Sequence, residues 1–66
     1  MLTVDMQKIL EDQFLGKRVI VKTKDGEFGG ICTFIGENEY FPSWGLQVTV
    51  GRCPLNNVLI KNIKLI

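Results

Sequence analysis

The feature that most limits how this chain can fold is a hairpin signal in its first half. The dipeptide Asp25-Gly26 separates two runs of alternating apolar residues. Such a dipeptide is among the strongest short-range signals for a tight turn, because glycine adopts positive φ without steric cost. The paired Gly29 and Gly30 follow in the second run, where glycine suits a strand that bends sharply. We therefore expect a small, strongly curved antiparallel sheet.

A helix is expected before this hairpin, over residues 4–15. The apolar residues of this stretch fall near helical spacing and form one stripe: Met6, Ile9, Leu10 and Phe14. A stripe of this kind indicates an amphipathic helix that packs on the sheet. Thr3 or Asp5 is suited to cap its start, and Gly16 is suited to end it in the left-handed conformation.

The rest of the pattern predicts five short strands in all. Strands are expected at residues 18–24, 27–35 and 46–50 and within 57–66, with a turn at 51–52 and a kink at 61–62. Pro54 restricts its neighbourhood to a strand start, a sheet edge or a bulge. Neither face of the second strand is polar, so it is either bent across two layers of core or covered by a neighbour.

The small size of the chain indicates that association with other subunits would add to its stability. Its 66 residues form one domain, and a chain of this length buries only about 60% of its unfolded surface. Small scaffolds usually need a disulfide, a metal or a partner subunit. Zinc is not expected, because the chain has no histidine and only two cysteines, Cys32 and Cys53. Both lie in apolar stretches and are expected to be buried, reduced thiols.

Composition also bears on location and chemistry. No basic stretch precedes an apolar run at the N-terminus, and no apolar run approaches the ~20 residues needed to cross a bilayer. A cytoplasmic protein without membrane contact is expected. Without histidine, a nucleophile elbow or a phosphate-binding loop, the sequence does not indicate an enzyme. No cofactor and no small-molecule substrate are expected.

Charges are sorted along the chain although the net charge is only +1. Residues 17–24 contain four basic side chains and no acid, and residues 25–39 contain four acids and no base. The last third adds Arg52, Lys61 and Lys64 without an acid. Two readings remain open: a basic face opposite an acidic face, or ordinary solvated strand edges.

One run of residues resembles a known family. The run comprises Gly16-Lys17-Arg18-Val19-Ile20-Val21 and, without insertion, Asp25-Gly26-Glu27-Phe28-Gly29-Gly30. It resembles the first motif of the Sm-like family, the small ring-forming RNA-binding proteins that include the bacterial Hfq proteins. The resemblance implies a mainly β fold, with an N-terminal helix followed by a five-stranded, strongly bent antiparallel barrel of SH3-like topology. It also implies a cyclic homo-oligomer of about five to eight protomers that binds single-stranded RNA or acts as an RNA chaperone.

The resemblance also implies RNA-binding residues. The family's second motif has its counterpart in Ile60-Lys61-Asn62-Ile63, which lacks the usual glycine. Lys61 stands where the family has an arginine, and Tyr40 falls on the later loop pair. Gly36 stands where the family has an aspartate. The residues implied to contact RNA are therefore Tyr40, Lys61 and Asn62.

The C-terminal segment is a candidate interface. Its apolar residues occupy both alternations of the expected strands, and an edge strand of this kind is an aggregation hazard unless it is paired. The candidate interface residues are Val58, Leu59, Ile60, Ile63 and Leu65. Two pairings remain open: edge-to-edge pairing with a neighbouring protomer, as in Sm-like rings, or pairing of the fifth strand with the first inside one chain.

Three aromatic residues cluster in the longest irregular stretch: Tyr40, Phe41 and Trp44. They are candidates for stacking on the bases of single-stranded nucleic acid. They equally suit the anchor of a protein partner, or a plug for one end of the barrel. The alternative function is therefore a non-catalytic barrel that binds protein or serves as a scaffold without nucleic acid.

Overall fold

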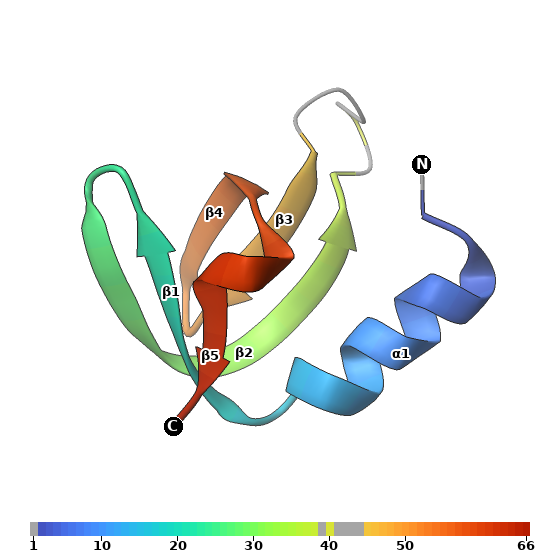
Figure 1. The fold of residues 1–66 in the computed structure, drawn as a ribbon, viewed down its shortest axis with the longest axis horizontal. Coiled ribbons are helices and arrows are strands. Elements are labelled where there is room, and N and C mark those ends of the chain that lie inside the picture. Colours follow the sequence, from blue (N-terminus) through green and yellow to red (C-terminus); the bar gives the residue numbers. More distant parts are fainter. Residues whose placement is uncertain (1, 39, 41–44) are drawn as a thin grey trace.

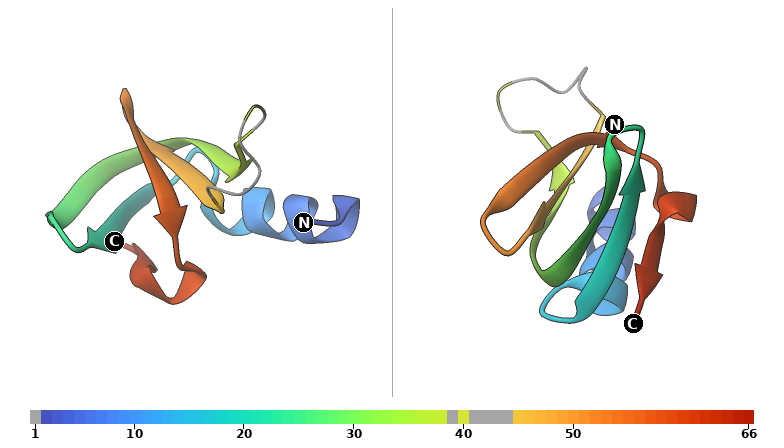
Figure 2. Two further views of the ribbon diagram at one scale, coloured as in Figure 1. Left: turned by 90° about the horizontal axis from the view of Figure 1, so that it is seen from above. Right: turned by 90° about the vertical axis from the view of Figure 1, so that its left-hand side faces the viewer.

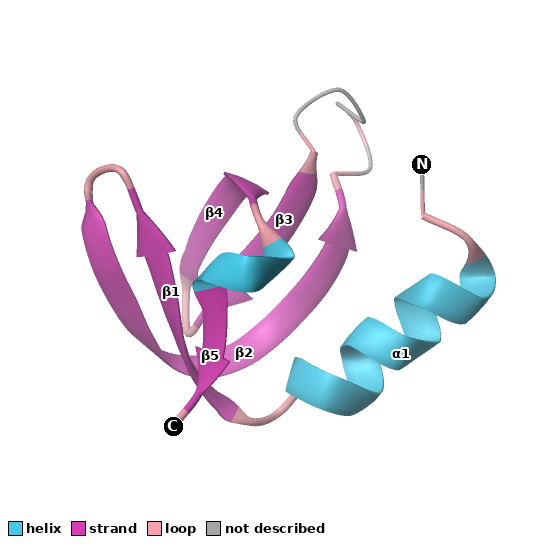
Figure 3. Cartoon of the chain, viewed as in Figure 1, coloured by secondary structure: helices cyan, strands magenta, loops and turns pink. Residues whose placement is uncertain are grey.

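The fold is mainly β with one N-terminal helix, as the sequence predicts. A computed structural model describes residues 2–38, 40 and 45–66 (Figure 1). Its elements are α1 (Val4–Phe14), β1 (Arg18–Thr23), β2 (Gly26–Glu37), β3 (Leu46–Val50), β4 (Cys53–Val58), the 3₁₀ turn η2 (Ile60–Asn62) and β5 (Ile63–Leu65). Figure 3 separates this helix, the strands and the loops by colour.

The five strands form one antiparallel sheet in the order β4-β3-β2-β1-β5. Figure 2 shows the strands curling around a common interior. The strands β4 and β5 stand at the two ends of the order and do not pair with each other, so the described part of the chain forms an open sheet. The fifth strand pairs with the first inside the chain, through Val19↔Leu65 and Val21↔Ile63. Of the two C-terminal pairings, the intramolecular one is therefore present, and it uses one edge of β5.

The second strand bends across two parts of the sheet. Its first half pairs with β1 and its second half with β3. At the bend, Gly30 has a φ of 156°, and a Cβ at this position would lie 3.0 Å from Cγ1 of Val50 on β3. A register shift between Cys32 and Phe34 then changes which alternation faces inward, so Cys32 and Ile35 are both buried. The bend and the bulge explain why the sequence shows no polar face here.

The core lies on the concave side of the curled sheet. Its buried residues are Leu10, Phe14, Val19, Val21, Cys32, Ile35, Val48, Val50, Val58 and Ile63. No buried polar or charged residue occurs in the described ranges. The predicted inward residues of the third strand, Val48 and Val50, are among them, and the predicted turn at 51–52 joins β3 to β4. Pro54 lies in β4, an edge strand, where a missing N–H is tolerated.

The helix begins and ends close to its predicted bounds. Thr3 is the N-cap, and its Oγ1 accepts a hydrogen bond from the Met6 backbone N–H at 3.1 Å. The helix ends at Phe14, and the following Leu15 N–H donates to the Glu11 carbonyl at 2.9 Å. Gly16 comes next with a φ of 78°, and its N–H donates to the Cys32 carbonyl at 2.7 Å. This bond links the end of the helix to β2 before the chain enters β1.

The predicted apolar stripe of the helix is wrong at two positions. Leu10 and Phe14 are buried, whereas Met6 and Ile9 are 45% and 55% exposed. Gln7 faces the sheet instead: its Nε2 donates to the Ile35 carbonyl at 2.6 Å. The amide fits there because Gly36 has no side chain, and a Cβ on Gly36 would lie 2.9 Å from Oε1 of Gln7. The face of the helix that packs on the sheet therefore includes the polar Gln7 in place of Met6 and Ile9.

The hairpin turn lies one residue earlier than expected. The turn residues are Lys24 and Asp25, and Gly26 already pairs with Thr23 as the first residue of β2. Oγ1 of Thr23 accepts from the Asp25 N–H at 3.2 Å and donates to the Gly26 carbonyl at 2.9 Å. This threonine therefore stabilises the turn locally.

The two cysteines lie in different environments. Cys32 is fully buried, as predicted, but Cys53 is exposed, so the prediction of two buried thiols is wrong for Cys53. The cause is its position at the start of edge strand β4. Both thiols are free.

Candidate functional site

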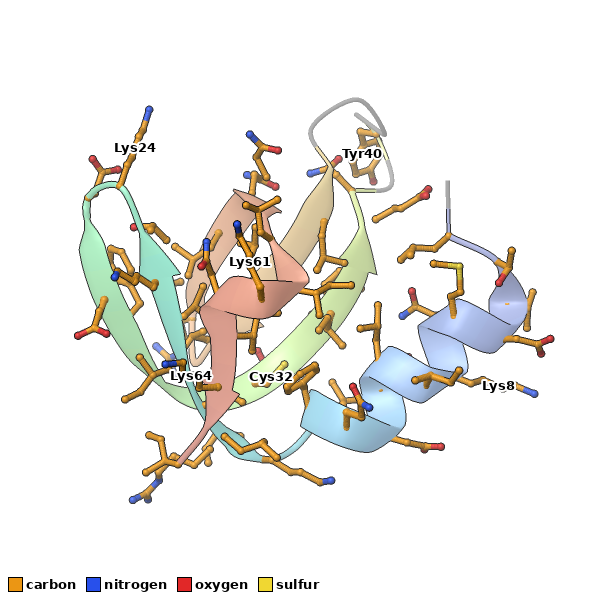
Figure 4. All side chains as sticks on the ribbon, viewed as in Figure 1. Lys8, Lys24, Cys32, Tyr40, Lys61 and Lys64 are labelled. Carbon is orange, nitrogen blue, oxygen red and sulfur yellow. The ribbon has the colours of Figure 1, made fainter. Side chains whose placement is uncertain are left out.

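The predicted kink at Lys61 and Asn62 is a 3₁₀ turn between β4 and β5. The Asn62 N–H donates to the Leu59 carbonyl at 2.9 Å and closes this turn. Lys61 is exposed on the turn, and Asn62 is half-buried beside it. In Figure 4, Lys61 stands on η2 and Lys24 at the tip of the β1–β2 hairpin.

A hollow of about 410 Å³ lies between this hairpin, strand β4 and the turn η2. We call it the hairpin hollow. It is lined by Lys22, Thr23, Lys24, Asp25, Phe28, Pro54, Leu55, Asn56, Asn57, Val58, Leu59 and Asn62. Of the residues expected to bind RNA, it contains only Asn62. The sequence prediction did not include the two lysines, Phe28 or the Asn56-Asn57 pair that also line the hollow. The only sequence feature that could have indicated them is the polar Asn56-Asn57 pair beside an apolar run.

Tyr40 lies on a different surface. Its side chain is 81% exposed, and its backbone N–H donates to Oδ1 of Asn38 at 3.0 Å. It lines a hollow of about 290 Å³ with Phe34, Asn38 and Gln47. This hollow and the hairpin hollow share no lining residue, so within one chain the structure does not bring Tyr40 to Asn62. Phe41 and Trp44, the other two aromatic candidates, lie outside the described residues.

The five candidate interface residues divide into two groups. The side chains of Val58 and Ile63 belong to the chain's own core. Leu59, Ile60 and Leu65 are 53%, 48% and 54% exposed. Leu59, Ile60 and Leu65 therefore have apolar side chains on the surface. Val58 in β4 and Ile63 in β5 have their side chains in the core.

A second hollow of about 420 Å³, the helix groove, adjoins this segment. It is lined by Leu2, Met6, Glu37, Gly45, Leu46, Val58, Leu59 and Ile60. The Leu2 backbone N–H donates to the Glu37 carboxylate at its edge. Most of the groove lining is apolar apart from Glu37, and Met6, which the sequence pattern assigned to the core, is partly exposed along it.

Pairing in the sheet partly cancels the charge sorting seen along the chain. Lys22 of β1 stands directly opposite Glu27 of β2, at the distance where unlike cross-strand charges attract. Lys64 of β5 stands opposite the apolar Ile20, and Lys61 on η2 is exposed. At this pair, a basic and an acidic residue therefore share one face of the sheet. Lys61 on η2 and Lys64 on β5 belong to the last third of the sequence, which contains no acidic residue.

The thiols and carboxylates form no metal centre in the described part of the chain. No group of three or more His, Cys, Asp or Glu side chains that could hold an ion occurs there. Burial raises the pKa of the Cys32 thiol, and a hydrogen bond with the Phe34 backbone opposes this effect to a smaller extent. A raised pKa keeps this thiol protonated and makes it a poor nucleophile.

Among the described residues, no helix has the length and apolar character needed to cross a membrane. A scan against protein-family models finds no match for the chain, and searches of curated proteins and of solved structures find none either.

Proposed function

We propose that this chain is a protomer of an Sm-like ring that binds single-stranded RNA. The architecture supports this proposal in three respects. A helix precedes five antiparallel strands, the second strand bends at paired glycines, and the fifth strand returns to the first. These are the features that the family motif at residues 16–21 and 25–30 implies for an SH3-like barrel.

The observation that carries the assembly is the state of the two end strands. Strands β4 and β5 lie at opposite ends of one sheet, and each has one edge without a strand partner in the described chain. Leu59, Ile60 and Leu65 are exposed beside them. If β4 of one protomer pairs with β5 of the next, the contact is head-to-tail and closes into a ring. Such closure removes every bare edge, which otherwise favours aggregation.

The RNA-binding part of the proposal rests on the basic and aromatic residues around these strands. Lys61 and Lys64 are exposed and attract phosphate. Tyr40 offers an exposed ring on which a base can stack. Within one chain Tyr40 and Asn62 lie on different surfaces, so a shared site would have to combine the residues of neighbouring protomers. RNA binding should therefore depend on assembly.

Two measurements test the proposal in order. Size-exclusion chromatography with light scattering, over a hundredfold dilution, is expected to give one species of about five to eight protomers. Fluorescence anisotropy with a labelled single-stranded RNA is expected to show affinity that falls as salt rises. A monomer at every concentration would refute the ring. RNA affinity that does not change with salt would refute contacts between the protein and the RNA phosphates.

The residue-level test is Lys61→Glu. This change is expected to abolish RNA binding without unfolding the protein, because Lys61 is exposed and packs on nothing in the core. The matched control is Lys8→Glu, the same charge reversal on the exposed face of α1 (Figure 4). If both variants retained wild-type affinity, the role carried over to Lys61 from the family would be wrong.

The helix groove favours a second candidate, a barrel that binds a protein partner. Its lining is mostly apolar apart from Glu37, and Met6, Leu59 and Ile60 are exposed along it. Binding of this kind is expected to be insensitive to salt and to depend on the exposed apolar side chains along the groove, Met6, Leu59 and Ile60. The salt series above therefore separates the two functions.

A further inference from the structure

The side of α1 that faces solvent has a pattern that the fold does not use. Leu10 and Phe14 are buried in the core, and successive residues of a helix are rotated by about 100°. The opposite stripe, which we call the helix face, contains Asp5, Ile9 and Asp12, at positions i, i+4 and i+7. All three are exposed, and Ile9 is 55% exposed. An isoleucine between two aspartates suits a partner that is apolar at its centre and basic around it.

The outer side of strands β1 and β5, which we call the sheet face, has the complementary pattern. The alternate residues of β1 are fully buried, so Arg18, Ile20 and Lys22 point away from the core. Lys64 of β5 stands opposite Ile20, and Ile31 of β2 stands opposite Arg18, so both lie on this side. The three basic residues are exposed, and Ile31 is 42% exposed. Aliphatic side chains therefore lie between positive charges on this face.

The two faces carry opposite charges. Strands β1 and β5 contain three basic residues and no acidic one, and α1 contains three carboxylates and one lysine. Glu27 of β2 stands opposite Lys22, whereas Arg18 and Lys64 stand opposite isoleucines. Beside the helix, Nζ of Lys17 donates to a backbone carbonyl of α1 at 2.7 Å. With Lys17 counted as a second base, the carboxylates still outnumber the lysines on the helix side, so unlike charges meet when the two faces meet.

The helix face cannot lie on the sheet face of its own chain. The first turns of α1 and the strands β1 and β5 stand at opposite sides of the molecule (Figures 1 and 2), as Lys8 and Lys64 show in Figure 4. The Cα atoms of Asp5 and Asp12 are about 10 Å apart along the helix. Those of Arg18 and Lys64, which are two residues and one strand apart, are about 8 Å apart. The long basic side chains span this difference, so a second copy can match the charges of the first.

We propose that the helix face of one copy docks on the sheet face of a second copy. Ile9 lies over Ile20 and Ile31. The two aspartates of the helix face lie beside Arg18 and Lys64. Because the two faces differ, the contact is head-to-tail, and each bound copy presents a free face to the next one. The contact uses the face of β5 and not its free edge, so it goes beyond the proposed ring and does not depend on it.

The size of the helix makes this contact weak. Its 11 residues form a face about 16 Å long and about 10 Å wide, which buries a few hundred Å² on each partner. A stable interface buries about 800 Å² on each partner. The association is therefore expected at protein concentrations on the order of 0.1–1 mM. Salt should weaken it, because the charges of both faces are exposed.

The test is a dilution series of the wild-type protein from about 1 mM to about 0.05 mM, followed by ¹⁵N–¹H NMR at about 0.02 M and about 0.5 M salt. At low salt, concentration-dependent amide shifts are expected at residues 5–12, 18–22 and 64–66, and they should disappear at high salt. The proposed ring is stable on dilution and contributes no such shifts. Shifts that are absent, insensitive to salt or confined to other segments would overturn the contact.

Charge reversal on the sheet face locates the contact. Arg18→Glu with Lys64→Glu is expected to weaken the association by about tenfold or more, because acidic side chains then face the aspartates. The matched control, Lys24→Glu with Lys61→Glu, makes the same change in net charge outside both faces and is expected to keep the association within about threefold. All four side chains are exposed, so the fold should persist, which circular dichroism checks. Equal losses in the two pairs would show unspecific charge attraction and overturn the contact.

A charge swap tests the pairing directly. Asp5→Lys with Asp12→Lys reverses the helix face, and alone it should weaken the association as the sheet variant does. Combined with Arg18→Glu and Lys64→Glu in one chain, it restores unlike charges between the faces at the wild-type net charge. Association should then return to within about threefold of the wild-type value, and a combined variant that stays dissociated would overturn the contact. If the helix variant does not fold, because it loses the acidic residue of the first turn, the sheet variant and its control still decide the question.

Leu65→Ser separates this contact from the ring. It is expected to shift the native mass toward the monomer and to leave the concentration-dependent shifts of both faces in place. Shifts that vanish in Leu65→Ser but persist in the double variant of Arg18 and Lys64 would assign them to the strand edges and overturn this inference. A monomer that still shows the shifts at both faces on concentration would defeat the ring and leave this inference standing.

Discussion

The bend of β2 gives the sharpest test of how the fold is built. At Gly30 an added Cβ would lie 3.0 Å from Cγ1 of Val50, and φ is 156°. At the neighbouring Gly29 an added Cβ would meet Ile20 and the Val19 carbonyl at 3.7 Å, which is ordinary contact. Gly30→Ala is therefore expected to destabilise the protein strongly, and Gly29→Ala, one residue away, is its matched control.

The expected loss follows from the neighbour that must move. Val50 is buried and β-branched, so its χ1 has few alternatives, and overpacking of this kind costs about 1–3 kcal/mol. The backbone conformation, which alanine adopts poorly, costs about 1–3 kcal/mol more. A chain of 66 residues has a total stability of about 3–10 kcal/mol, so Gly30→Ala removes a large share. Gly29→Ala is expected to change stability by less than about 1 kcal/mol in either direction.

Urea unfolding followed by far-UV circular dichroism measures both variants. Protomer concentration is held fixed, because assembly would make the midpoint depend on it. A double variant, Gly30→Ala with Val50→Ala, opens space for the new methyl group and should lose less than the sum of the two single changes. Equal stability of the Gly29 and Gly30 variants, or strict additivity in the double variant, would refute the close approach of β2 and β3.

Three further predictions concern the helix start and the thiols. Thr3→Ala removes the acceptor for the Met6 N–H and is expected to lower the unfolding free energy by about 1 kcal/mol. Thr3→Ser keeps a hydroxyl acceptor and should retain most of the stability. An equal loss of stability in both variants would contradict the cap. Cys53 is expected to react with Ellman's reagent in the native protein and Cys32 only after unfolding, whereas equal rates would contradict the burial of Cys32. Since burial raises the pKa of Cys32 in the folded state, the unfolded chain releases this proton first, so stability is expected to fall as pH rises above the ordinary thiol range, about 8.5. Urea midpoints across that range should show this slope, and Cys32→Ala should flatten it.

The parts of the fold that sequence predicted are those decided by local chemistry. Thr3 at the helix start, the turn near Asp25 and the alternation of Leu46 to Val50 each depend on neighbours within a few residues. The side of the helix that packs depends instead on a residue 28 positions away, because Gln7 bonds to the carbonyl of Ile35. Periodicity gives no information about such a partner. The same reason explains why Met6 was assigned to the core.

The candidate site was harder to predict because its parts are brought together by the sheet. The hairpin hollow joins Lys22 and Phe28 with Asn56 and Asn62, from segments more than twenty residues apart. Only the register of β1 with β2 and the course of β4 past the hairpin make them neighbours. The family motif in the sequence implied that Tyr40, Lys61 and Asn62 contact RNA. Of these three residues, only Asn62 lines the hollow.

The C-terminal segment provides a physical argument for assembly that does not depend on resemblance. Its five apolar candidates cannot all face one core, because the 3₁₀ turn between β4 and β5 interrupts the alternation. Val58 and Ile63 complete the chain's own core, whereas Leu59, Ile60 and Leu65 remain about half exposed beside the two end strands. A polar residue at any of these three positions would cost the folded monomer little, so their apolar character is explained best by a partner that covers them. Leu59→Ser and Leu65→Ser should accordingly leave the circular dichroism spectrum unchanged and shift the native mass toward the monomer, and an unchanged mass would remove the argument.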